Sequence, residues 1–178
     1  MAFGKPELDL ASLRVLSGWA ADCAERVLFI FLKAAADDPR PKAAIVAARK
    51  FADGASRDND LRKRALDAFR AANAAGQSAA AAAAHSASAA AGAAFLHPLA
   101  NPHQVKHILG AAAYAALALE REGAETASDA VVQMVADAPP EIVALLVQYP
   151  ACAPAKGRLG EILVELDTRL RHPAKHRK

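Results

Sequence analysis

The chain has 178 residues, of which 49 are alanine and only 5% are aromatic. Because alanine is the strongest helix former and carries little burial energy, this composition favours many closely packed helices and argues against a sheet protein. The formal net charge is +3, but five of the 22 basic residues lie in the last ten positions. No apolar run is long enough to span a membrane.

The first helical pattern covers residues 8–34. A short apolar stripe opens it, formed by Leu10, Leu13 and Leu16, and Ser17-Gly18 is expected to break the helix after this stripe. Large side chains then recur at three- and four-residue steps: Trp19, Cys23, Val27, Ile30 and Phe31. This spacing predicts an amphipathic helix whose large residues anchor the core.

Two further helices are expected before residue 77. Asp38 precedes a proline, which excludes helix at that point, and Pro41 suits the first turn of the next helix. That helix should end at Gly54, and the following one should run from Asp58 or Asn59 to Gly76. Its predicted inward stripe consists of Leu61, Ala65, Ala68, Phe69 and Ala72.

Residues 77–96 are almost pure alanine and admit two interpretations. They could form a low-complexity linker, or a central helix that its neighbours approach closely. We favour the helix, because a linker would contain more glycine, proline and charge. His85 is then a structural histidine in this helix, with Tyr114 or Asp22 as its expected neighbour.

The remaining elements begin at clear capping signals. Asn101-Pro102 starts a helix in which Gly110 is expected to allow close packing, and Thr126 with Asp129 resembles a capping box. A short helix follows Pro139-Pro140, and the last helix carries apolar residues from Leu159 to Leu170. No repeat of fixed period holds over three units.

These patterns predict an all-α protein: an irregular orthogonal bundle of about eight or nine helices around the alanine-rich helix. We expect one domain over residues 1–170 and a basic, flexible tail over 171–178. The predicted core consists of Trp19, Val27, Phe31, Ile45, Phe69, Ile108, Leu109, Ile162 and Leu166.

Histidines are the strongest candidates for chemistry. His103 and His107 stand four residues apart on one helix face, with His97 nearby, which is a weak zinc-ligand pattern without a carboxylate or cysteine beside it. The alternative is that they cap or bridge helices. Phosphate-binding, dinucleotide-binding and nucleophile-elbow motifs are absent from the sequence. We therefore predict no catalytic residues, no cofactor and no metal.

Cysteine and charge bear on location and partners. Cys23 and Cys152 are not in a metal-ligand spacing such as C-x-x-C and do not make a disulfide framework, and no secretory signal opens the chain. Both points favour a reducing, cytoplasmic setting. The charges near the apolar stripe of the first helices are expected on a solvated face, with a buried Asp–Arg pair across the break at residues 37–41 as the alternative; these charges are Arg14, Asp22, Arg26, Arg40 and Arg49.

Several segments resemble a known family. The run from Trp19 to Leu28 contains Trp19, Asp22, Cys23, Glu25 and Arg26 in order, and a loop with Arg40 and Pro41 comes after it. A His-x-x-x-His-x-x-Gly-Ala-Ala-x-Tyr-Ala stretch then carries His103, His107, Gly110 and Tyr114. Over roughly residues 10–120 the chain resembles the immunity-protein-5-like family of bacterial immunity proteins. It departs from the family in a proline-broken loop at residues 95–102.

The resemblance implies a cytoplasmic, all-helical protein that binds and neutralises a cognate toxin without catalysis. Two alternatives remain. A helical nucleic-acid-associated protein would use the tail and the arginines of residues 57–70, although the sequence disfavours nucleic acid because no other basic face is evident. A histidine-dependent metal enzyme is the other. The toxin and its binding surface are not identifiable from sequence, and a homodimer stays open because alanine-rich helices pack equally well between chains.

Overall fold

The computed structural model describes residues 4–153 and 156–172. These residues form eight α-helices and one 3₁₀ turn, with no strand in the described ranges. The helices are α1 (Leu10–Ala34), α2 (Arg40–Ala52), α3 (Asn59–Ala74), α4 (Ala79–Gly92), α5 (Pro102–Glu122), α6 (Ala127–Ala136), α7 (Pro140–Leu146) and α8 (Arg158–Arg171), and the 3₁₀ turn η1 is Ala93–Phe95. The prediction of an all-helical bundle is confirmed.

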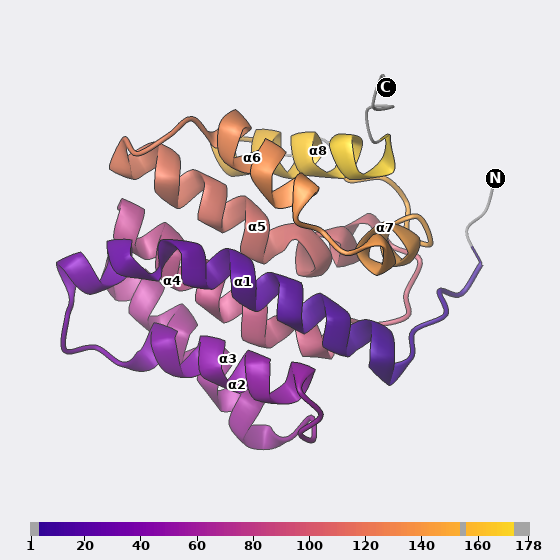
Figure 1. The fold of residues 1–178 in the computed structure, drawn as a ribbon, viewed down its shortest axis with the longest axis horizontal. Coiled ribbons are helices and arrows are strands. Elements are labelled where there is room, and N and C mark those ends of the chain that lie inside the picture. The colour runs from indigo at the N-terminus through magenta and orange to yellow at the C-terminus, as the bar shows by residue number, and fades with distance from the viewer. Residues whose placement is uncertain (1–3, 154–155, 173–178) are drawn as a thin grey trace.

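The alanine-rich helix lies at the centre of the fold. α4 packs against α1, α2, α3 and α5, and in Figure 1 α1 passes in front of it. Helices α5, α6 and α8 lie on one side of α1 in this view, and α2 and α3 lie on the other. Since nine of the α4 residues are buried alanine or serine, neighbouring backbones can approach it closely. The interpretation of residues 77–96 as a helix is confirmed.

The helix ends follow their capping residues. Side-chain oxygens of Asp9, Asp58, Ser78, Asn101 and Thr126 each accept a backbone N–H at the start of a helix. At the other end of α5, Gly123 adopts φ +75°, a left-handed conformation that favours glycine. Local sequence chemistry therefore sets most of the boundaries.

Two sequence predictions about local structure are wrong. Ser17 and Gly18 do not break the first helix, because Ser17 is fully buried and Gly18 packs beside Ala52. Phe69 is not a core residue: it is 46% exposed, while α3 buries Leu61 and three alanines instead. The other eight predicted core residues are buried.

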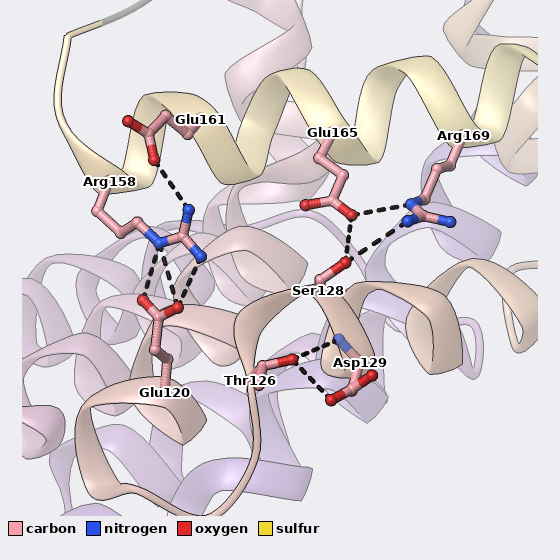
Figure 2. Close-up of polar contacts among 8 residues, drawn as sticks. All are labelled: Glu120, Thr126, Ser128, Asp129, Arg158, Glu161, Glu165 and Arg169. Atoms are coloured by element: carbon pink, nitrogen blue, oxygen red, sulfur yellow. Dashed lines mark hydrogen bonds and ion pairs between the residues drawn. The ribbon is translucent and has the colours of Figure 1, made fainter.

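The C-terminal helix is fastened to α5 and α6 by polar contacts. Arg158 donates to both carboxylate oxygens of Glu120, at 2.6 Å from Nη2 and 2.9 Å from Nε, and also pairs with Glu161. Ser128 of α6 donates to Glu165, which pairs with Arg169 (Figure 2). These charges neutralise one another within the fold, so this cluster is a structural connection.

The expected tail begins inside the last helix. Arg171 belongs to α8, whereas residues 173–178, which include Lys175, Arg177 and Lys178, lie outside the described residues. No helix in the described ranges has the length and apolar character needed to cross a membrane.

Candidate functional site

The family-like histidine stretch forms one stripe of α5. His103, His107, Gly110 and Tyr114 succeed one another at steps of four, three and four residues, which places them on the same helix face. Most of α5 is buried, but His103 and His107 are exposed and Tyr114 is half-buried. The part of this stripe at His103 and His107 is therefore open to contact from outside, whereas Gly110 is buried.

Small residues of α4 lie beside this stripe. Ser88, Ala89 and Gly92 form the half-buried side of α4, and the Ser88 hydroxyl donates to the carbonyl of Ala65 on α3 at 2.9 Å. A Cβ atom added at Gly110 would lie 3.5 Å from the Cβ of Ala89, which is an ordinary van der Waals distance. Gly110 is therefore buried where α5 meets α4, but the contact has room for a Cβ atom and does not itself require glycine.

Helix α3 supplies the other wall of a shallow depression. Leu66 is 50% exposed, Phe69 is 46% exposed, and both flank a cavity of about 300 Å³. Its lining includes Leu66, Phe69, Ser88, Ala89, Gly92 and His107, with Lys106 at the edge. We call this feature the α3–α5 groove. It is mainly apolar, with walls from two helices and a floor of small residues from a third.

Aromatic rings close one end of the α3–α5 groove. The ring of His85 stacks on Tyr114 with centroids 4.8 Å apart and meets Phe69 edge-on at 5.4 Å. Partial burial lowers the pKa of His85 below its usual value and raises the pKa of the Tyr114 hydroxyl. Both rings therefore stay neutral at neutral pH. The expected contact of His85 with Tyr114 is confirmed.

Stability should fall as the solution is acidified through the ordinary histidine range. Below pH 6.5, the usual pKa of histidine, the unfolded chain takes up protons that folded His85 and His107 resist. Burial lowers the pKa of His85, and the neighbouring side chains lower that of His107 by partly desolvating it, even though part of His107 stays exposed. As far as these two histidines determine it, the free energy of unfolding is therefore highest above pH 6.5 and declines as the pH falls below that value. Urea titrations from pH 7.5 to 5 should show a shallower decline for His85→Gln than for the natural chain.

The exposed His103 provides the control for this pH dependence. His103→Gln removes a histidine from the exposed part of α5, so the difference between the pH profiles of the two variants isolates the effect of burial at His85. Equal profiles for the His85→Gln variant and the natural chain would contradict the assignment to His85.

The three candidate metal ligands do not converge with other ligand types. His97 lies near enough to His107 to contribute to lowering the pKa of His107, after the larger effect of burial. Within residues 4–153 and 156–172, no group of three or more His, Cys, Asp or Glu side chains is placed to hold a metal ion. His107 instead lines the α3–α5 groove, and the backbone of His97 is held by Gln104 and Tyr149.

The motif residues of α1 divide between core and surface. Trp19 and Cys23 are buried. Asp22 and Glu25 both pair with Arg49 of α2, the first at 2.8 Å. These exposed ion pairs connect neighbouring helices and contribute little individually.

Two further ion pairs involve motif arginines. Arg26 reaches Asp137 after α6 at 2.7 Å, so it connects α1 to a distant part of the chain. Arg40 pairs with Asp38 at 2.6 Å across the break at residues 37–41, but both side chains are partly exposed, so this is not the buried Asp–Arg pair considered there. Pro41 is buried in the first turn of α2. Arg26, Arg40 and Pro41 therefore stabilise the connections between helices.

Cys23 should be chemically inert in the folded protein. Burial raises the pKa of its thiol to about 12, and the thiolate is the form that reacts with alkylating reagents. With Cys152→Ala removing the other free thiol, iodoacetamide at about pH 8 should not modify Cys23 until urea unfolds the chain. Rapid modification without urea, detected by mass spectrometry, would contradict its burial.

The arginines considered for nucleic-acid contact have partners within the protein. Arg57 donates to the carbonyl of Ala94 at 3.1 Å, and the Arg62 guanidinium lies 4.5 Å from the centre of the Phe95 ring. Arg64 and Arg70 pair with aspartates of the same helix. The other proposed contact, the tail beyond His172, lies outside the described residues.

The match with a family model decides the family. The model described as Imm-5 like putative immunity protein matches residues 7–139. The chain belongs to this family. The resemblance seen over roughly residues 10–120 is therefore confirmed, and the match extends through α6. No curated protein and no solved structure matches the chain.

The family match includes all three helices of the α3–α5 groove, whereas α7 and α8 lie after it. Sequence reasoning identified the histidine stretch but missed Leu66 and placed Phe69 in the core. The missed signal is the register of α5: His103 and His107 lie on a side that the rest of the fold leaves exposed, whereas Gly110 of the same stripe is buried beside Ala89.

Proposed function

We propose that this immunity-family protein acts in the cytoplasm by binding a cognate toxin protein and blocking it without catalysis. Family membership over residues 7–139 supports the immunity role. The single observation that supports recognition by contact is the open part of the stripe on α5: His103 and His107 are exposed on a helix most of whose residues are buried. Side chains that the fold leaves exposed are available to a partner.

The chemistry of the α3–α5 groove supports binding over catalysis. Its lining is mainly apolar, and its titratable members are Lys106 and His107. No carboxylate lines it that could orient a histidine as a general base. An exposed apolar and aromatic surface of this kind is typical of protein interfaces.

Affinity capture from the producing bacterium tests the proposal. The full chain and a chain ending after His172 serve as two baits, since the shorter one keeps all of α8. We expect both to retain the same protein, one that stops growth when expressed alone and is harmless when co-expressed with this chain. Recovery of nucleic acid by the full chain only would instead support the nucleic-acid alternative.

A titration separates blocking from catalysis. If the protein acts by binding, the residual activity of the captured toxin should fall linearly and end at equimolar protein. Continued loss of toxin activity at substoichiometric protein would contradict a non-catalytic mechanism.

Metal analysis of the purified protein tests the histidine-dependent alternative. Stoichiometric zinc or iron that is lost in His103→Ala would support it.

A further inference from the structure

We propose that the α3–α5 groove is the toxin-binding surface, and that it receives an apolar side chain which projects from an acidic surface of the toxin. This inference rests on the proposed function and adds the place and the chemistry of recognition.

The apolar part of the inference follows from the shape of the groove. Leu66 and Phe69 leave about half of their surface exposed and both line the groove, so they form a contiguous apolar wall, and contiguous exposed apolar surface of this kind marks interaction sites. Between the walls, Ala89 and Gly92 leave room, and a Cβ atom at Gly92 would meet no atom within 4 Å. A side chain from a partner can therefore reach the floor and bury both walls, as an interface hot spot does.

The electrostatic part follows from the charges around the groove. No Asp or Glu stands between Asp67 and Glu120, the segment that supplies all of α4 and nearly all of α5. Lys106, which lines the groove, forms no ion pair with a carboxylate among the described residues. A partner surface over the groove thus meets an unpaired positive charge, which favours a carboxylate.

The same charges argue against a second copy of this chain as the occupant. In a symmetric dimer through the α3–α5 groove, the same patch of both copies would meet. Lys106 would then face a groove that also carries Lys106, and the described lining of that groove contains no carboxylate to neutralise it. A different protein with an acidic surface has the complementary charge.

The other motif-bearing surface is less suited to a partner. On the outer side of α1, Asp22 and Glu25 already pair with Arg49, and Arg26 pairs with Asp137. These charges are satisfied within the fold, so a partner would have to compete with existing ion pairs. At the groove, a carboxylate of the partner would face Lys106 without displacing an ion pair of the described residues.

Affinity measurements with the captured toxin test the surface. Leu66→Glu places a carboxylate against an acidic partner, and Gly92→Leu fills the groove at a position with free space. We expect each to weaken binding by roughly 30-fold or more. Val132→Glu is the matched control, because Val132 of α6 is 43% exposed and lies outside the groove, and its affinity should be unchanged. Gly92→Leu also improves helix propensity, so loss of folding does not explain its effect.

A charge reversal tests the chemistry. Lys106→Glu should weaken binding by about 10-fold at low salt, and the difference from the natural chain should shrink as salt screens the surface. Unchanged affinity for Leu66→Glu and Gly92→Leu would contradict the assignment of the α3–α5 groove as the toxin-binding surface. Unchanged or tighter binding by Lys106→Glu would contradict the inference that the partner surface is acidic.

Photo-cross-linking in the producing cell separates failure of the surface from failure of the proposed function. A benzophenone amino acid at position 66 should cross-link to the captured toxin, whereas the same group at position 132 should not. An adduct of twice the chain mass from position 66 would indicate a second copy and overturn the inference. If the toxin is captured and neutralised but cross-links only from position 132, the α3–α5 groove is not the binding surface, and the proposed immunity function still holds. If neither capture nor cross-linking yields a toxin, both proposals fail.

Discussion

Arg171→Ala is expected to lower the free energy of unfolding by about 3 kcal/mol, because it leaves a buried carboxylate without its counter-charge. The side chain of Asp167 is 5% exposed and that of Arg171 is 14% exposed, and they pair at 2.8 Å. The Nη2 atom of Arg171 also donates to the carbonyls of Leu146 and Tyr149, at 3.0 and 3.1 Å. Losing the arginine therefore removes support from both α8 and the end of α7.

The neighbouring Arg169 gives a matched control on the same helix. It pairs with Glu165 at 2.9 Å (Figure 2). Both of these side chains are far more exposed than those of the Arg171–Asp167 pair. Arg169→Ala should cost less than about 1 kcal/mol, as exposed pairs usually do. Urea denaturation of the two variants measures the difference. Equal midpoints for both would show that the Arg171 network contributes no more than a surface ion pair.

This contrast defines where the basic C-terminal segment can be removed. A chain that ends before Arg171 loses the buried ion pair, so a loss of partner binding would be confounded with loss of stability. A chain that ends after His172 keeps α8 complete and removes only residues 173–178. The second truncation is therefore the one that tests a role for the tail.

The boundaries of most helices were predictable because their signals are local. Pro102 after the capping Asn101 and the left-handed Gly123 act through the backbone of their own segment. The continuity of α1 across Ser17 and Gly18 was not predictable in this way. Packing of that segment against α2, with Gly18 beside Ala52, outweighs the weak helix propensity of the pair.

The position of Phe69 was mispredicted for a reason that follows from the composition. Periodicity normally turns the largest apolar residue of an amphipathic helix inward. Here the neighbouring α4 presents alanines, and α3 packs against it through Ala68, Ala71 and Ala72, which allow close approach. Phe69 is left at the border of this contact, where it meets His85.

The candidate site was only partly visible in the sequence. The histidine stretch on α5 was evident as a pattern along one helix. The α3–α5 groove was not, because Phe69, Gly92 and His107 come from three separate helices and become neighbours only in the folded chain. Sequence spacing describes one helix face, whereas a groove requires the register of one helix against another.

Ala87→Leu should also destabilise the protein by roughly 3 kcal/mol, at the upper end of the usual cost of overpacking a core. Ala87 is fully buried in α4, the helix that packs against α1, α2, α3 and α5. These helices can approach α4 closely only because its side chains are small. The three carbon atoms that leucine adds beyond Cβ would force at least one neighbouring helix outward. Thermal and urea unfolding of the variant measure the loss.

Ala89→Leu places the same side chain on the other side of the same helix. Ala89 is half-buried and borders the α3–α5 groove, so the larger side chain can extend into open space. Its stability should stay within about 0.5 kcal/mol of the natural chain, as for most surface substitutions. Because helix propensity changes equally in the two variants, their difference isolates packing. Equal losses for both would mean that the groove side of α4 is packed as tightly as its core side.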